Sequence, residues 1–408
     1  MKKNLGLYIH IPFCIRKCAY CDFLSFPLDD KSQPKGSVSQ DVVTKYVTAL
    51  EKEIRSFHEI ESEAYQVNTI FVGGGTPSIL AVKEIESIFQ ALRGNFSIAK
   101  DAEISIEVNP GTVTGEKVKA WKSIGINRLS IGLQSINDEE LRILGRAHTF
   151  RQFQETFATV RAAGFGNVSV DLISGIPGQR LEGFMKTLEE IGQYSPEHIS
   201  SYGLIIEEGT IFGELYGDKL IDGGTRGVRC PPLPSEDTDW EMYKQTEEIL
   251  MSLGYHRYEI SNYAKVGFTC KHNIKYWERE EYLGIGLGAA SLLKETRYRN
   301  ITDMGMYLKR VQGNQSVRDD EGMEALSLKE QMDEFLYLGL RQIKGVSKAK
   351  FQQYFGKSLE LVYKEAISKL TGMGLLIVGR DNVRLTERGI DVSNSVFVEF
   401  ISYRTEAS

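Results

Sequence analysis

The chain has 408 residues, of which 41% are hydrophobic and 25% charged, and its formal net charge is -6. This composition is ordinary for a globular protein with a sizeable core, and the negative charge disfavours nucleic acid and anionic lipid as partners. No apolar run approaches the roughly 20 residues that span a bilayer, and the first residues lack a signal-peptide core. We therefore expect a cytoplasmic protein with at most peripheral membrane contact.

Short β-branched runs alternate with longer amphipathic stretches in the first half of the chain. This alternation predicts parallel strands joined by helices, and six such units predict an α/β fold with an incomplete (β/α)6 barrel. The predicted strands are 5–11, 69–72, 103–108, 128–133, 168–173 and 198–204. The predicted helices are 41–60, 82–94, 115–124, 138–144, 150–163 and 181–194.

The pattern changes after about residue 300. Three predicted helices, 326–342, 347–355 and 359–373, precede a predicted hairpin over 375–385. We therefore expect one domain over residues 1–300 and a mostly helical, winged-helix-like domain over 301–408. A stretch rich in Gly and Pro at about 215–239 predicts a flexible loop within the first domain.

Three of the five cysteines lie within eight residues, directly after the first predicted strand. Cys14, Cys18 and Cys21 have the spacing C-x3-C-x2-C. In a reducing compartment such a group favours metal binding over disulfides. Three thiolates can bind three irons of a [4Fe–4S] cluster and leave the fourth iron open, whereas zinc would need a fourth ligand such as His10. The spacing favours the cluster but leaves both metals open.

The cysteine loop resembles that of the radical S-adenosylmethionine superfamily. The runs YIHIPFC at 8–14 and GGGTP at 73–77 are similar to the branch that contains oxygen-independent coproporphyrinogen III dehydrogenase and the heme chaperone HemW. The resemblance covers about the whole chain. It implies a [4Fe–4S] cluster on the three cysteines, S-adenosylmethionine (SAM) at the open iron, and a flavodoxin- or ferredoxin-like electron donor.

The same resemblance implies which residues hold SAM. The glycine segment matches the part of the family that hydrogen-bonds the methionine amino group, and several polar residues at strand ends match its nucleoside pocket. The expected SAM-binding residues are Tyr8, Tyr20, Gly74, Gly75, Thr76, Glu107, Gln134, Arg146 and Asp171. Without the resemblance, the glycines predict a turn and Glu107 a solvated strand end. Asp171 interrupts an apolar strand and needs a partner, for which Arg146 is the structural candidate.

Three features favour the chaperones over the dehydrogenases. The dehydrogenases have a fourth cysteine where this chain has Phe23, and an extension of several tens of residues before the cysteine loop, which here starts at residue 14. The run HNIKYW at 272–277 also resembles the chaperones. Imidazole is a common ligand of heme iron, so His272 is the candidate heme contact, with a structural histidine as the alternative.

We therefore expect a protein that binds heme and transfers it to heme-accepting proteins. The alternative is a coproporphyrinogen III dehydrogenase, and the sequence leaves open whether SAM is cleaved or only bound. Nucleic-acid binding by the C-terminal helices is not expected, because acidic residues intersperse their basic ones.

Overall fold

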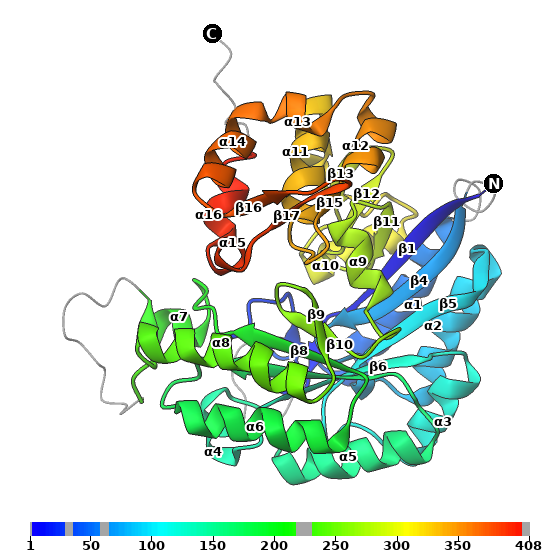
Figure 1. The fold of residues 1–408 in the computed structure, drawn as a ribbon. Coiled ribbons are helices and arrows are strands. Elements are labelled where there is room, and N and C mark those ends of the chain that lie inside the picture. The colour runs from blue at the N-terminus through cyan, green and yellow to red at the C-terminus, as the bar shows by residue number, and fades with distance from the viewer. Residues whose placement is uncertain (1, 29–35, 58–64, 218–230, 402–408) are drawn as a thin grey trace.

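Six parallel strands form the centre of the computed structural model, which describes residues 2–28, 36–57, 65–217 and 231–401. They follow one another across the sheet in the order of the chain, which is the predicted arrangement. The sheet curves as an open, partial barrel (Figure 1). The six strands are β1 (Lys3–Ile11), β4 (Tyr65–Gly74), β5 (Ile98–Val108), β6 (Arg128–Gln134), β7 (Val168–Ser174) and β8 (His198–Gly203).

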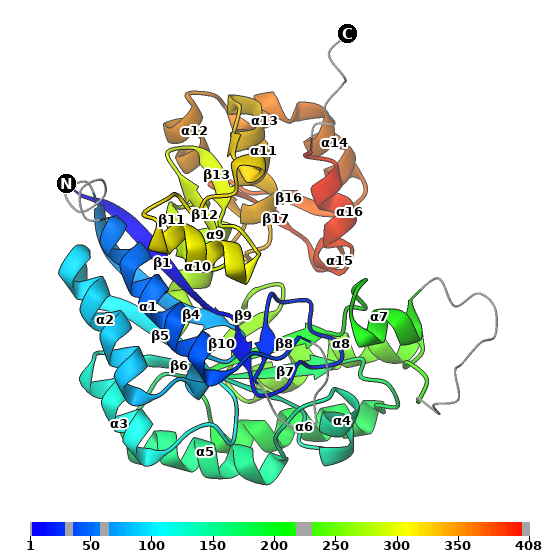
Figure 2. The ribbon, with the colours of Figure 1, turned by 180° about the vertical axis from the view of Figure 1, so that it is seen from behind.

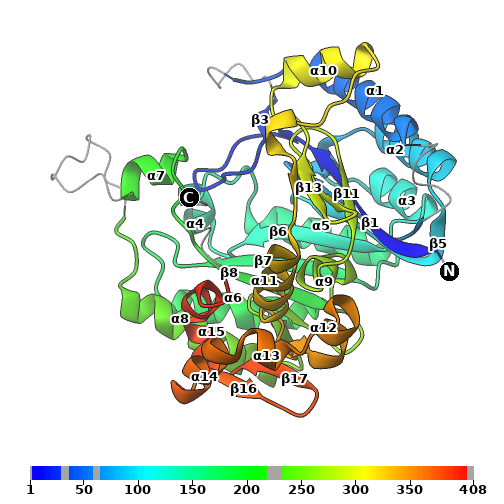
Figure 3. The ribbon, with the colours of Figure 1, turned by 90° about the horizontal axis from the view of Figure 1, so that it is seen from above.

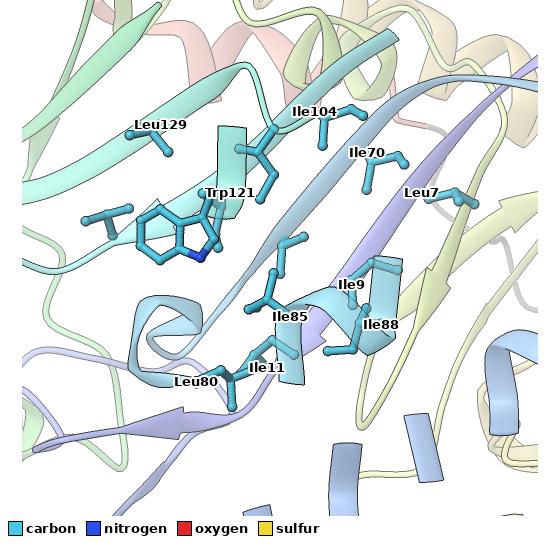
Figure 4. Packing of buried hydrophobic residues seen from close by; sticks show 14 of the residues in the cluster. Leu7, Ile9, Ile11, Ile70, Leu80, Ile85, Ile88, Ile104, Trp121 and Leu129 are labelled. Carbon is cyan, nitrogen blue, oxygen red and sulfur yellow. The ribbon is translucent and has the colours of Figure 1, made fainter. Parts of the chain in front are cut away.

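The predicted helices between these strands are also present, and they cover the outer face of the sheet (Figure 2). Alternate strand residues point to this face, because side chains in a strand have a period of two. Ile104 of β5 and Leu129 of β6 lie in one buried cluster with Trp121 of α3 (Figure 4). The helices are α1 (Gln40–Ser56), α2 (Val82–Asn95), α3 (Gly115–Ser123), α4 (Asp138–Ile143), α5 (Phe150–Ala162) and α6 (Leu181–Tyr194).

Short strands that the sequence did not predict extend the sheet on both edges. On one side, β11 (Tyr282–Ile285) pairs in parallel with β1, and three antiparallel strands follow it. On the other side, an antiparallel pair continues from β8. These further strands are β12 (Ala290–Leu293), β13 (Thr296–Arg299), β14 (Glu324–Ala325), β10 (Asn262–Ala264) and β9 (His256–Glu259). Near the cysteines, β2 (Phe13–Cys14) pairs with β3 (Phe26–Pro27).

The remaining helices of the first domain are α7 (Ile211–Tyr216), α8 (Glu236–Ser252), α9 (Lys271–Trp277) and α10 (Met304–Gln312). The first two correct the predicted loop at 215–239, because α7 continues to Tyr216 and α8 begins at Glu236, where Ser235 caps it. Residues 218–230 of that stretch lie outside the described residues. No helix in the described ranges is both long and apolar enough to cross a membrane.

The C-terminal part combines helices with a three-stranded sheet and lies beside the barrel (Figures 1 and 3). The predicted helix over 359–373 is wrong as a single element, because the non-helical Tyr363 divides it. The elements are α11 (Leu328–Gly339), β15 (Val346–Ser347), α12 (Lys348–Phe355), α13 (Leu359–Val362), α14 (Lys364–Gly372), β16 (Leu376–Val378), β17 (Asn382–Leu385), α15 (Glu387–Asp391) and α16 (Ser393–Val398).

The division between the two hydrophobic cores lies later in the chain than the predicted domain boundary at residue 301. Ile301 and Tyr307 belong to the core of the barrel, and the second core begins at Met332. Tyr307 is fixed there by Glu53 of α1, whose carboxylate accepts its hydroxyl at 2.6 Å. Between the two parts, Lys244 of α8 pairs with Asp391 of α15 at 3.0 Å.

Trp121 gives a direct test of the layer between helices and sheet. Its side chain is fully buried, so Trp121→Ala should lower the free energy of unfolding by about 3–5 kcal/mol through lost burial and the remaining cavity. The measurement is urea unfolding followed by circular dichroism. Val266→Ala is the control, because Val266 is 84% exposed and its loss should change stability by less than about 0.5 kcal/mol. If the two variants unfolded at the same urea concentration, the burial of Trp121 between the helices and the sheet would be contradicted.

Candidate functional site: a cysteine loop at the strand ends

Backbone hydrogen bonds fix the cysteine loop to three neighbouring segments, which follow β4, follow α4 and begin α7. The amide of Thr76, after β4, donates to the carbonyl of Phe13 at 2.7 Å. The amide of Ala19 donates to Leu144 O at 3.0 Å, and its carbonyl accepts the amide of Phe212 at 2.9 Å. The loop therefore has one defined position at the carboxyl ends of the parallel strands, where chemistry gathers in parallel barrels.

The three thiols of the loop are free, and each has polar or charged surroundings. Cys14 is buried, and its sulfur accepts a hydrogen bond from Thr76 Oγ1 at 3.5 Å. The sulfur of Cys18 accepts one from Arg146 Nη1 at 3.6 Å. Burial raises the pKa of the Cys14 thiol and raises that of Cys21 to about 11. Iron would supply the positive charge that thiolates need in this environment.

The donor set fits a cluster better than a single zinc ion. Within the described residues, no three His, Cys, Asp or Glu side chains form a group that could hold a metal ion. A cubane cluster binds each thiolate through a different iron, so its ligands need not converge on one point. His10, the fourth zinc ligand considered from the sequence, uses Nδ1 with the hydroxyl of Tyr8 at 3.0 Å and Nε2 with the carbonyl of Leu24 at 2.9 Å.

The glycine segment brings β4 into contact with the cysteine loop. Gly74 has a φ of +112°, and a Cβ at this position would lie 2.5 Å from the ring of His10. A Cβ at Gly75 would lie 2.6 Å from the carbonyl oxygen of Phe13. Both positions therefore require glycine. The amide of Gly74 donates to Glu107 Oε2 at 3.0 Å, which places that carboxylate beside the loop.

Two partly buried carboxylates, Glu107 and Asp171, lie on the inner face of the sheet. Burial, and then the charge of Asp171, raise the pKa of Glu107 to about 7. Asp171 accepts hydrogen bonds from Ser130 at 3.1 and 3.2 Å and from Ser169 at 3.4 Å, and burial raises its pKa. Serine side chains of β6 and β7 thus donate hydrogen bonds to Asp171. Arg146, the partner considered from the sequence, does not take this role.

Arg146 instead joins the cysteine loop to β5 and β6. Its Nη2 donates to Asn109 Oδ1 at 2.7 Å and to the carbonyl of Gly132 at 2.6 Å, and its Nη1 lies 3.5 Å from the hydroxyl of Tyr20. Asn109 also donates to Thr76 Oγ1 at 2.8 Å. Asn109 was not among the predicted site residues, although its place directly after a strand was a signal for it.

The other predicted SAM residues lie around these groups. Gln134 is buried with a φ of +76° at a register shift between β6 and β7. A non-glycine residue in this conformation is strained, and such strain is found at functional sites. A Cβ on Gly132 would meet Arg146 Nη2 at 3.1 Å and Gln134 Nε2 at 3.2 Å. Tyr8 stacks on Phe71 with ring centroids 6.4 Å apart.

His272 lies away from the loop, on α9, and its ring packs against β4. Its Nδ1 is 2.9 Å from Thr69 Oγ1 and its Nε2 is 2.8 Å from the hydroxyl of Tyr276. The side chain is 1% exposed, and burial lowers its pKa to about 3. This geometry favours a structural role for His272. To ligate heme iron, the ring would have to give up the hydrogen bond to Thr69 or the one to Tyr276.

Comparison with known proteins agrees with the motifs. Residues 8–191 match the model of the radical SAM superfamily, and residues 326–392 match the HemN C-terminal domain. The chain is 35% identical to a protein of Lactococcus lactis named heme chaperone HemW, over 98% of each chain. The chain belongs to the HemW family of radical SAM proteins. Proteins with the same name are 33% identical in Bacillus subtilis, over 97% of this chain and 98% of theirs, and 32% identical in Escherichia coli, over 98% of each.

The fold has a solved counterpart. The structure of coproporphyrinogen III oxidase (HemN) from Escherichia coli, described as a radical SAM enzyme, superposes with a TM-score of 0.82 over 98% of this chain and 91% of that one. The sequences are 24% identical, so this match shows the fold alone. Membership of the superfamily implies a [4Fe–4S] cluster and SAM, and the three cysteines are the residues that would hold the cluster.

Removing one thiol of the loop should remove the cluster. In Cys18→Ala, iron after anaerobic reconstitution should fall from about four to below about two atoms per chain. Cys270→Ser is the matched control, because Cys270 is buried elsewhere and bonded to Glu103. Iron and sulfide analysis measures both variants, and a full cluster in Cys18→Ala would contradict the assignment.

The pKa of Glu107 predicts a pH dependence for SAM binding. A carboxyl with a pKa of about 7 is neutral below that pH and ionised above it. Because SAM is a cation at its sulfonium and ammonium groups, its affinity should rise about tenfold from about pH 6 to about pH 8. Equilibrium dialysis measures this change. Glu107→Gln should bind weakly with a flat profile, whereas Glu139→Gln, an exposed helix position, should keep the slope. A slope retained in Glu107→Gln would contradict the role of that carboxyl.

Proposed function

We propose that this chain is a heme chaperone, which binds heme and transfers it to heme-dependent proteins. Full-length similarity to proteins named heme chaperone HemW in three bacteria carries the proposal. Phe23 supports the proposal. It occupies the position at which the related dehydrogenases have a fourth cysteine, and its side chain, 64% exposed, cannot bind iron.

In this proposal, Cys14, Cys18 and Cys21 hold the cluster and the strand ends around them hold SAM. The reduced cluster supplies the electron with which radical SAM proteins cleave the sulfonium bond. Thr76 and Arg146 contact two of the sulfurs and orient the loop. The nine predicted SAM residues stay proposals, and the polar inner face formed by Glu107 and Asp171 is where a cationic nucleoside would be stabilised.

The proposed partners are proteins that accept heme and a small flavodoxin- or ferredoxin-like electron donor. Arg16 and Lys17 are exposed on the cysteine loop, so a donor with acidic side chains would find opposite charge there. We propose that the protein works in the cytoplasm, where free thiols persist.

The alternative function is oxidative decarboxylation of coproporphyrinogen III. The fold match to the HemN structure favours it, since the two chains share nearly their whole architecture. Function depends on the site rather than on the fold, however, and the site departs from the dehydrogenases at Phe23.

Two titrations on one reconstituted sample distinguish these functions. Hemin should bind near 1:1 with a change in the visible absorbance of the heme, because a chaperone must hold its cargo. Coproporphyrinogen III should give no carbon dioxide under anaerobic, reducing conditions. Reproducible decarboxylation together with absent hemin binding would overturn the proposal.

The role of His272 needs its own variant. If the ring is structural, as its two hydrogen bonds indicate, His272→Gln should bind hemin with unchanged affinity and lose about 1–3 kcal/mol of stability. If His272 ligates iron, the same variant should lose the heme spectrum while its thermal midpoint changes little. Absorbance and thermal unfolding on the same preparation decide between these results.

A further inference from the structure

Two buried polar groups on the inner face of the sheet have no hydrogen-bond partner among the described residues. These groups are Arg128 Nε and Ser105 Oγ, and their residues are 2% and 0% exposed. A buried donor without an acceptor loses its hydration and gains nothing in return, and the cost is larger for a charged group. The cost is understandable where a ligand supplies the missing acceptor.

The register of the sheet places these two groups side by side. Ser105 of β5 and Arg128 of β6 are direct pairing partners. Their neighbours Ile104 and Leu129 point to the outer layer of helices, as Figure 4 shows. Ser105 and Arg128 therefore point to the inner face, where Ser105 lies about 7 Å along the strand from Glu107.

Nearby carboxylates leave the Nε of Arg128 without an acceptor among the described residues. Glu103 accepts the backbone amides of Lys271 at 3.1 Å and His272 at 3.0 Å, and Asp171 accepts from serines. Burial opposes the charge of Arg128, yet the charges of Cys270 and Glu103 around it hold its pKa above the ordinary value. The result is a permanently charged guanidinium with one N–H, that of Nε, left without an acceptor.

We propose that Arg128 and Ser105 form a carboxylate-binding subsite inside the barrel, which takes a propionate of the tetrapyrrole. A guanidinium prefers a carboxylate, and an adjacent hydroxyl can donate to the same oxygen atoms. This inference rests on the proposed function, because heme is the ligand that carries the propionate. In this arrangement the tetrapyrrole lies inside the barrel with this carboxylate directed toward β5 and β6.

The test compares hemin with its dimethyl ester, in which both carboxylates are masked, on the reconstituted full chain. Wild type should bind hemin about 10- to 100-fold more tightly than the ester, as expected for hydrogen bonds to a charged group. In Arg128→Gln this preference should fall to near onefold, and in Ser105→Ala it should shrink severalfold. The ratio of the two affinities is insensitive to a general loss of stability.

Arg257→Gln is the matched control. Arg257 is also buried, but its guanidinium is satisfied by Glu247 at 3.0 Å and by the hydroxyl of Tyr243 at 2.7 Å. This variant should keep the preference for hemin over the ester, even if it is less stable.

The outcomes separate the two proposals. Equal binding of hemin and ester by wild type overturns the subsite and leaves heme binding intact. A preference that persists in Arg128→Gln also overturns it, since the carboxylate then binds elsewhere and only buried water occupies these groups. If neither compound binds wild type, the proposed function fails, and the subsite fails with it. The wild-type comparison remains decisive even if Arg128→Gln does not fold.

Discussion

The site depends on a short cysteine loop that three separate segments hold by their backbones. The end of β4 fixes its start through Thr76 and Phe13. The segment after α4 and the start of α7 fix its middle, because Ala19 bonds to Leu144 and to Phe212. The glycines of β4 are needed because a Cβ at Gly75 would overlap the backbone of the loop. Arg146 then connects the sulfur of Cys18 to β5 and β6. These contacts hold the thiols in a defined position at the carboxyl ends of the barrel strands.

The sequence predicted the six central strands because their apolar runs are long, β-branched and separated by clear amphipathic helices. It missed β11 and the strands beyond it, because four-residue strands acquire their identity only from pairing with β1 or with each other. The division at Tyr363 was missed for a similar reason. Its hydroxyl donates to Asp333 of α11 at 2.6 Å, a tertiary contact that no local pattern reveals.

The cysteines and the glycine segment were recognisable in the sequence, whereas the partners of the polar residues were not. Asp171 was correctly marked as costly, but its partners are Ser130 of β6 and Ser169 of β7, which pair with each other two residues before the level of Asp171. Arg128 raised no signal, since an arginine at the start of a strand is usually solvated. Only the strand register shows that it is buried beside Ser105. Inner-face contacts depend on register, which the sequence pattern leaves undetermined.

The central claim is that the three thiols hold a cluster whose fourth iron is free for SAM. Electron paramagnetic resonance of the dithionite-reduced, reconstituted protein tests it most directly, with spectra before and after SAM is added. The account predicts a reduced-cluster signal that changes shape when SAM is added. Adenosine, which lacks the methionine part of SAM, should leave the signal unchanged. A colourless protein with one zinc ion per chain, or a cluster signal indifferent to SAM, would contradict it.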